Sequence, residues 1–150
     1  MLKTKSGLSV AGLENLNKKK FFIIYSAVFA LILLFTFRNF IADGFTFIRY
    51  GDGYWQHFSC LEYYGKWLRQ IIRTLLFEHR FEIPMWDFSI GLGSDVITTF
   101  NYYVIGDPLA LLSALVPVKY TPYLYCFLVV LRYYLSGLFF SLYCFERKHR

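Results

Sequence analysis

A run of uncharged, apolar residues near the amino terminus constrains the fold more than any other feature of the sequence. It reads FFIIYSAVFALILLFTF and covers residues 21–37. If Arg38 extends to the headgroups, the segment continues to residue 42 and is long enough to cross a bilayer as a helix. A cleaved signal peptide is the competing interpretation. However, the apolar run of this chain is longer than that of a signal peptide, and no small-x-small cleavage site follows it closely. The run therefore predicts a transmembrane helix over residues 21–42.

A second hydrophobic segment, residues 122–145, contains a single charge, Arg132, and is long enough to span a bilayer with some tilt. The whole chain is 57% apolar and 22% aromatic, which is typical of membrane proteins rather than soluble domains. Residues 43–121 are too numerous and too charged to lie in lipid. We therefore predict an all-α membrane protein with two transmembrane helices and a layer of interfacial helices between them.

The distribution of positive charge predicts the orientation of the chain. Residues 1–20 carry five lysines and one glutamate, and residues 146–150 carry three Lys or Arg residues and one glutamate. Short basic flanks stay in the cytoplasm. We expect a cytoplasmic tail at 1–20, an extracytoplasmic loop at 43–121 and a cytoplasmic end at 146–150. Because the net charge of +6 comes mainly from the flanks, it does not indicate nucleic-acid binding.

The loop begins with an amphipathic pattern. From residue 55 to about residue 81, apolar side chains recur at intervals of three and four, which predicts a helix lying in the interface plane and ended by Pro84. Its basic stripe could attract anionic headgroups or a phosphorylated lipid; a solvated helix face is the alternative. The apolar positions are Phe58, Leu61, Tyr64, Leu68, Ile71, Ile72, Leu75 and Leu76, and the charged positions are Glu62, Lys66, Arg69, Arg73 and Arg80.

The remainder of the loop is rich in glycine, proline and aromatic residues. The motif GLG at 91–93 lacks the third glycine and the lysine of a phosphate-binding loop. It favours a surface loop packed by Trp86, Phe88 and Phe100. Residues 108–117 are too few to span a bilayer and predict a short interfacial or re-entrant helix.

Two charged residues stand beside or within these apolar segments. Asp107 is expected to be the N-cap of the short helix. Arg132 lies near the middle of the second span, where a charge costs about 2.5–3.5 kcal/mol on insertion scales. Neither span contains an acid, so we expect the partner of Arg132 to be an anionic substrate or to lie in sequence beyond residue 150. Snorkelling of a tilted helix is the alternative.

Cysteine and histidine give no sign of a disulfide framework or a structural metal site. Cys60 lies in the loop, whereas Cys126 and Cys144 fall within the second span. There is no CxxC pair, and the three histidines lack partners at zinc-ligand spacing. We therefore predict no metal-ligating residues. The sequence indicates no particular cofactor and leaves open whether a divalent metal assists a reaction.

In order along the chain, the motifs GDGYWQHF, IPMWDFSIGLGSD, FNYYVIGDPLALLSALVP and LSGLFFSLY resemble the start of the YfhO-like bacterial membrane proteins. The resemblance runs from about residue 21 to the end. It implies the polytopic C-type glycosyltransferase fold and transfer of a sugar from a polyprenyl-phosphate carrier to a cell-envelope polymer, such as a teichoic acid, on the outer face. A polyprenyl-phosphate glycosyltransferase is then an expected partner. Since that family has many more spans, we expect this chain to be an N-terminal fragment, inactive alone.

The resemblance also implies a role for the acid in GDGYWQHF. Enzymes of this fold place an acidic residue in the first extracytoplasmic loop, and the matching position is Asp52. A carboxylate can act as general base for an acceptor hydroxyl that attacks the anomeric carbon. Gln56 and His57 are then polar neighbours for sugar hydroxyls, and Arg132 or a basic residue of the interfacial helix could stabilise the leaving phosphate. Asp107 is the second acidic candidate. An N-cap role for Asp52 is the alternative.

Two other functional classes remain open. In the first, the chain is a non-catalytic membrane subunit or sensor and its acids are structural. In the second, it belongs to a lipid-carrier transporter in which Arg132 pairs with a moving phosphate. Retention of sugar transfer after replacement of Asp52 would favour the first class, and carrier flipping without sugar transfer would favour the second.

Overall fold

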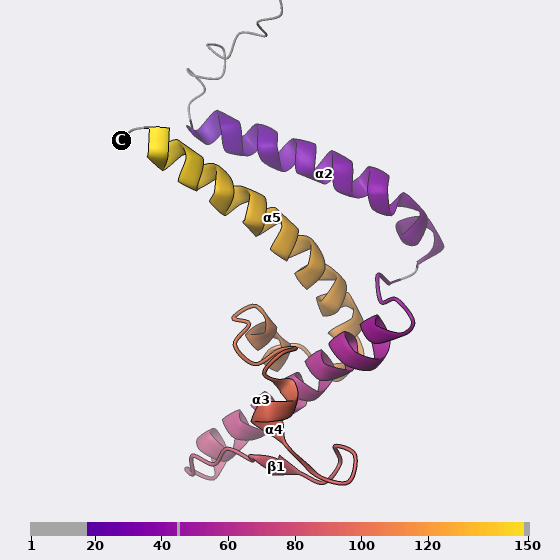
Figure 1. Ribbon diagram of the computed structural model, residues 1–150, viewed down its shortest axis with the longest axis vertical. Coiled ribbons are helices and arrows are strands. Elements are labelled where there is room, and N and C mark those ends of the chain that lie inside the picture. Colours follow the sequence, from indigo (N-terminus) through magenta and orange to yellow (C-terminus); the bar gives the residue numbers. More distant parts are fainter. Residues whose placement is uncertain (1–17, 45, 149–150) are drawn as a thin grey trace, which may run out of the picture. The chain divides into compact units, whose positions relative to one another are not determined.

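The computed structural model describes residues 18–44 and 46–148, and most of them are helical (Figure 1). The predicted cytoplasmic tail at 1–20 lies almost wholly outside these residues. The elements, in order, are helix α2 (Lys18–Asp43), the π-helical turn η1 (Gly53–Phe58), helix α3 (Ser59–Phe77), strands β1 (Trp86–Asp87) and β2 (Ser94–Asp95), helix α4 (Val96–Phe100), the 3₁₀ turns η2 (Ala110–Ala114) and η3 (Val118–Tyr120), and helix α5 (Thr121–Lys148).

The chain divides into two compact units. The first contains the described residues of 1–44 and 137–150, and the second contains those of 45–136. Helix α5 therefore contributes its first part to the second unit and its last part to the first. The pockets described below belong entirely to the second unit.

Helix α2 carries apolar side chains on every side. Ile23, Leu31 and Phe35 remain 69%, 67% and 71% exposed within the chain. A helix that is apolar all round must be surrounded by a protein core or by lipid, and no such core covers α2 among the described residues. Both α2 and α5 are long and apolar enough to cross a membrane. The predicted fold class, a helical membrane protein with two membrane-spanning helices, is confirmed.

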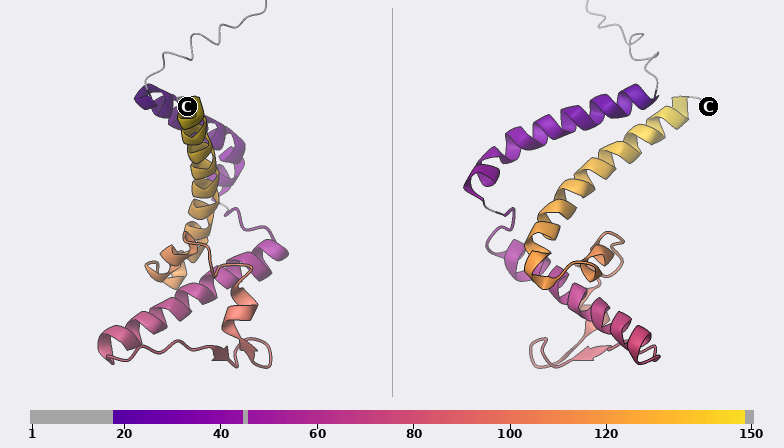
Figure 2. Two further views of the ribbon diagram at one scale, coloured as in Figure 1. Left: turned by 60° about the vertical axis from the view of Figure 1, so that its left-hand side comes forward. Right: turned by 180° about the vertical axis from the view of Figure 1, so that it is seen from behind.

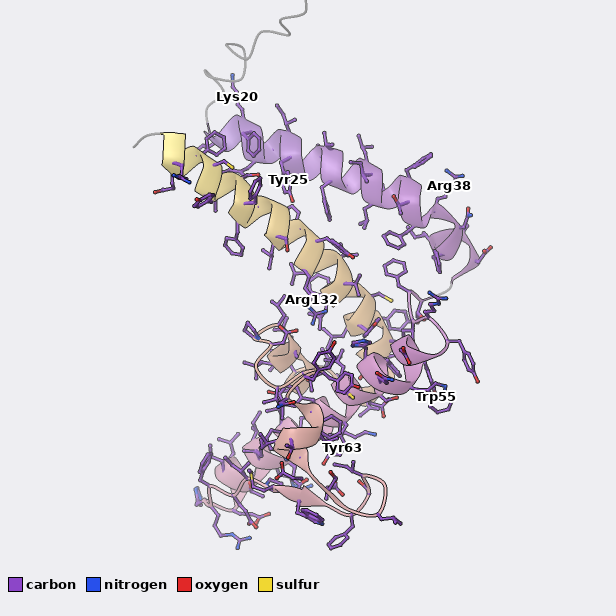
Figure 3. The ribbon with its side chains drawn as sticks, viewed as in Figure 1. Lys20, Tyr25, Arg38, Trp55, Tyr63 and Arg132 are labelled. Carbon is purple, nitrogen blue, oxygen red and sulfur yellow. The ribbon has the colours of Figure 1, made fainter. Side chains whose placement is uncertain are left out.

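The first part of α2 contacts the last part of α5 through aromatic rings. The ring centroids of Phe21 and Phe145 lie 5.0 Å apart in an edge-to-face arrangement. One turn further along α2, Tyr25 approaches Gly137 so closely that a Cβ atom there would lie 2.3 Å from the tyrosine hydroxyl. A glycine permits this approach of a bulky side chain to a helix backbone. The two helices thus meet at this point through an aromatic cluster and a small residue (Figure 3).

Helix α3 is the centre of the second unit and corresponds to the predicted amphipathic helix. It packs chiefly against η2 in the segment 101–120, which lies beside it in both views of Figure 2. Gly65 permits the contact, because a Cβ atom there would lie 2.7 Å from the carbonyl oxygen of Ser113. Arg69 donates hydrogen bonds to the carbonyl oxygens of Ser113 and Val116, each at 2.7 Å. Arg69 of the predicted basic stripe is therefore engaged in packing.

Helix α3 ends earlier than predicted, at Phe77 rather than near residue 81. In its last turn, the carbonyl oxygen of Thr74 accepts the N–H groups of Glu78 at 3.1 Å and of Arg80 at 3.3 Å. His79 then adopts a positive φ of 52°, which takes the chain out of the helix. The prediction that Pro84 ends the helix is therefore wrong, because the turn at His79 ends it first.

The segment predicted as a glycine-bearing loop contains a short antiparallel hairpin of β1 and β2, which the sequence analysis did not anticipate. Gly93, with φ of +110°, adopts a conformation that favours glycine. A Cβ atom there would lie 3.0 Å from Nε1 of Trp86 and 3.1 Å from Cδ1 of Phe88. Trp86 and Phe88 therefore pack around Gly93 while staying largely exposed. Phe100 is buried and stacks on Tyr63, with ring centroids 4.5 Å apart.

The short helix predicted within 108–117 is present as the five-residue 3₁₀ helix η2, between two proline-containing connections. Asp107 does not occupy its N-cap position, which is Leu109; the carboxylate of Asp107 instead accepts the N–H of Leu109 at 2.9 Å, just ahead of the turn. The first turns of α5 cover this region with a buried face. That face consists of Thr121, Leu124 and Leu128, which are 4%, 7% and 0% exposed.

The close contact at Gly65 predicts that Gly65→Ala destabilises the second unit. The added methyl group would collide with the backbone of Ser113, and such overpacking costs about 1–3 kcal/mol. The unfolding midpoint of the chain in lipid nanodiscs, followed by loss of helical circular dichroism, measures this effect. Gly53→Ala is the matched control, because its Cβ would make only an ordinary 3.4 Å contact with Arg49. Equal midpoints for the two variants would contradict the packing argument.

Candidate functional site

A pocket of about 190 Å³ lies within the second unit, where η1, the start of α3, the segment 103–107 and the first part of α5 meet. Three of the predicted site residues, His57, Asp107 and Arg132, line it, although they are far apart in the sequence. Arg132 is labelled in Figure 3. The full lining consists of His57, Leu61, Tyr103, Val104, Asp107, Tyr125 and Arg132.

The guanidinium group of Arg132 is paired with the carboxylate of Asp107. Nη2 of Arg132 donates to Oδ2 of Asp107 at 2.5 Å. Arg132 therefore has a partner within the described residues, whereas the expectation placed it in a substrate or beyond residue 150. That expectation considered only acids within the two spans, but the connecting segment brings an acid to the arginine. Asp107 uses its other oxygen, Oδ1, to accept the N–H of Leu109.

Opposing effects set the charge state of Asp107. Burial raises the pKa of its carboxyl group, but the hydrogen bonds from Arg132 and Leu109 and the positive charge of Arg132 together lower it below the ordinary value. Asp107 is therefore an anion at neutral pH. Burial, followed by the negative charge of Asp107, raises the pKa of the Tyr64 phenol, which stays neutral. The Asp107–Arg132 pair thus places two opposite charges at the pocket with little net charge.

A chain of hydrogen bonds connects Asp52 to the pocket. Nε2 of Gln56 donates to Oδ1 of Asp52 at 3.0 Å, and the hydroxyl of Tyr103 donates to Oε1 of Gln56 at 3.0 Å. The ring of Tyr103 also contacts His57 edge to face, with centroids 5.5 Å apart. Asp52 and Gln56 are exposed and do not line the pocket themselves. The structure therefore places Asp52 next to the pocket and joins it there through Gln56 and Tyr103.

The local backbone explains the position of Asp52. Gly51 has a φ of +99°, in the region that favours glycine, and Asp52 is the first residue with helical dihedral angles. Asp52 occupies the N-cap position of η1, as the alternative interpretation expected, but its side chain makes no capping hydrogen bond with any residue that the structure describes. The π-helical turn η1 follows directly. π-Helical turns are rare in proteins, and those that occur are often found at functional sites.

Sequence reasoning missed Tyr103 and Tyr125, which line the pocket. The chain contains 13 tyrosines, and no spacing distinguishes these two from the others. Their position depends on how residues 101–120 fold against α5. Two further acids of the second unit lie outside this pocket: Asp87 accepts a hydrogen bond from Tyr63, and Asp95 caps α4.

Potential metal ligands in residues 18–44 and 46–148 do not form a cluster, and the thiol of Cys60 is buried. No three His, Cys, Asp or Glu side chains in these ranges come together as metal ligands would. Cys60 is 8% exposed, and burial raises the pKa of its thiol to about 11. A thiol of this kind carries very little thiolate at neutral pH, and is therefore a poor nucleophile.

These features define a class: a helical membrane protein in which a segment between two apolar helices forms a polar pocket beside a charged residue of the second helix. The family described as bacterial membrane protein YfhO matches residues 20–150, and the chain belongs to this family. The resemblance drawn from the sequence motifs is confirmed. No curated protein and no solved structure matches the chain.

A double-mutant cycle of Asp107→Asn and Arg132→Gln tests the ion pair. Both side chains are partly exposed, at 28% for Asp107 and 43% for Arg132, so we expect a coupling of only about 0.5–1 kcal/mol near neutral pH. Because the pKa of Asp107 is lowered in the folded state, this stabilisation is present above the ordinary carboxyl pKa. It is lost as the pH falls through the lowered value.

The measurement is the unfolding free energy of the four chains in nanodiscs at neutral pH and at a series of acidic pH values. A coupling that is absent at neutral pH, or that grows on acidification, would show that the two side chains do not stabilise each other in this way.

Proposed function

We propose that the protein takes part in transferring a sugar from a polyprenyl-phosphate carrier to a cell-envelope polymer of the teichoic-acid type, on the outer face of the bacterial membrane. Membership of the YfhO family supports a membrane glycosyltransferase-like role. The observation that carries the proposal is the pocket that joins His57, Asp107 and Arg132 to the Asp52–Gln56 pair. A separate polyprenyl-phosphate glycosyltransferase would load the carrier.

In this proposal the pocket receives the phosphate of the carrier. Its volume of about 190 Å³ is below the roughly 300–1,000 Å³ of sites that enclose a whole small molecule, so it suits a phosphate group rather than a complete lipid-linked sugar. A guanidinium group has five N–H donors, and Asp107 accepts from only one of its terminal nitrogens. The remaining donors of Arg132 can bind phosphate oxygens while Asp107 holds the group in place, and they stabilise the charge that develops on the leaving phosphate.

Asp52 then acts on the acceptor. Its carboxylate is exposed and accepts one hydrogen bond, from Gln56, which leaves acceptor capacity for a second donor. An acceptor hydroxyl that binds there can pass its proton to Asp52 as its oxygen attacks the anomeric carbon and the bond to the phosphate breaks. His57, which is exposed at the pocket, and the second N–H of Gln56 are available to sugar hydroxyls. Carrier and acceptor would thus approach from different sides.

The proposal predicts that Asp52→Asn abolishes sugar transfer. With the substitution in the chromosomal gene, so that the protein is made as the cell makes it, sugar on the isolated envelope polymer should fall by about 10²-fold or more, because general-base catalysis contributes that much. Asp43→Asn, an exposed acid at the end of α2, is the matched control and should retain transfer. Normal glycosylation at normal protein level in Asp52→Asn would refute the base assignment and favour a non-catalytic subunit.

The proposed orientation predicts that residues 43–121 face the exterior. Native Cys60 is a poor reporter because it is buried and its thiol pKa is about 11. Leu92 is fully exposed in the hairpin, so Leu92→Cys, with Cys126 and Cys144 replaced by alanine, should react with a membrane-impermeant maleimide in intact cells. Lys20→Cys, at the start of α2, should react only after permeabilisation. The reverse pattern would invert the topology and remove the proposed chemistry from the outer face.

A further inference from the structure

A second and larger groove, of about 550 Å³, lies between the exposed side of α3 and the hairpin of β1 and β2. None of the residues that line it lines the pocket at Arg132. We propose that this groove binds a neutral sugar ring in the pyranose form. This goes beyond the proposed function, because it concerns a separate site that can hold a saccharide whether or not transfer takes place at Asp52.

The aromatic side chains of the groove provide the apolar part of such a site. Trp86 and Phe88 line it and are 56% and 78% exposed. Their rings are held near each other, with centroids 6.2 Å apart and planes at 69°, and the absent side chain of Gly93 makes room for them. A pyranose presents C–H groups on its faces, and these can pack on the face of an exposed indole ring. Exposed indole rings held in place by the backbone lose little entropy when a ligand binds.

The polar side chains of the groove match the hydroxyl groups of a sugar. Asp87 accepts hydrogen bonds from the hydroxyl of Tyr63 at 2.6 Å and from the N–H of Ser89 at 2.7 Å, one on each oxygen. Each oxygen keeps a second lone pair for a ligand donor. The amide of Gln70 supplies both donors and an acceptor, and it has no hydrogen-bond partner among the side chains that the structure describes. The carboxylate of Asp87 can therefore accept from a sugar hydroxyl, and the amide of Gln70 can both donate to one and accept from one.

The Asp87 carboxylate is fixed in position and in charge. The hydrogen bond from Tyr63, and then those from Ser89, lower the pKa of Asp87 below its ordinary value. Burial, and then the bond to Asp87, raise the pKa of the Tyr63 hydroxyl, which remains a donor. Asp87 is therefore a charged acceptor with a defined orientation. Tyr63 is labelled in Figure 3.

The charge of the groove argues against an anionic ligand. Lys66 is the only cation in the lining, and its ammonium group is paired with Glu62 at 2.6 Å. With Lys66 compensated, Asp87 would repel an anion such as a phosphate polymer. A neutral, hydroxyl-rich ligand does not meet this penalty, and it uses the hydrogen-bonding groups of Asp87 and Gln70 that a tetraalkylammonium cation would leave unmatched. The volume is within the roughly 300–1,000 Å³ of small-molecule sites.

Saturation-transfer difference NMR on the whole chain in lipid nanodiscs tests the proposal. Nanodiscs are needed because a glycosidic detergent would itself present a sugar ring to the groove. The probes are methyl β-glucopyranoside and methyl N-acetyl-β-glucosaminide, with tetramethylammonium and glycerol phosphate as ionic alternatives. We expect saturation transfer to the ring protons of at least one glycoside and none to the ionic probes.

Matched variants locate the binding. Trp86→Ala should weaken glycoside binding by about tenfold or more, as loss of a principal aromatic contact does. Trp55→Ala removes an equally exposed tryptophan, at 62%, that lies outside the groove, and should leave binding unchanged. Gln70→Ala, at an exposed position of α3 where alanine favours the helix, should weaken binding without affecting folding.

Three results would each overturn the proposal. They are the absence of binding of either glycoside, equal effects of Trp86→Ala and Trp55→Ala, and a preference for an ionic probe. Because the readout is binding rather than transfer, its failure leaves the role of Asp52 untouched. In the same way, loss of transfer in Asp52→Asn with intact glycoside binding would separate the two sites.

Discussion

The ion pair of Arg132 with Asp107 is the interaction on which the candidate site depends. A guanidinium on an apolar helix needs a partner, and the carboxylate that meets this need comes from a connecting segment. The pairing joins Asp107 to α5 beside Tyr103 and Val104, which line the same pocket as His57. The loop that supplies the partner of Arg132 thus also forms one wall of the site.

Helix α3 contributes side chains to both pockets described above. Leu61, near its start, lines the pocket at Arg132, whereas Tyr63 and Gln70 line the larger groove beside the hairpin. Neighbouring positions on a helix point in different directions, so one helix can serve two sites of different chemistry. The first site pairs opposite charges in a small space. The second combines exposed aromatic rings with a fixed carboxylate in a larger one.

The parts of this structure that could be predicted from sequence are those with a local signal. Uninterrupted apolar runs identified α2 and α5, and spacing by three and four identified α3. The carboxyl end of α3 was predicted too far along the chain, because the turn at His79 has no distinctive residue type. The hairpin was missed because its strands have two residues each, too few to show alternation. The partner of Arg132 and the roles of Tyr103 and Tyr125 depend on contacts between distant segments, which periodicity does not contain.

Helix α2 has one further consequence. Because its apolar side chains surround it evenly, rotation about its own axis changes little in its solvation by hydrocarbon. Partly buried positions nevertheless recur along the helix, at 21, 22, 25, 26, 29, 33 and 37. Among them, Phe21 and Phe22 contact Phe145, and Tyr25 contacts Gly137. Exchange of one aliphatic residue for another at the exposed positions of this helix should therefore be nearly neutral for stability. Substitution of Phe21 or Tyr25, in contrast, would change how helix α2 is rotated about its own axis.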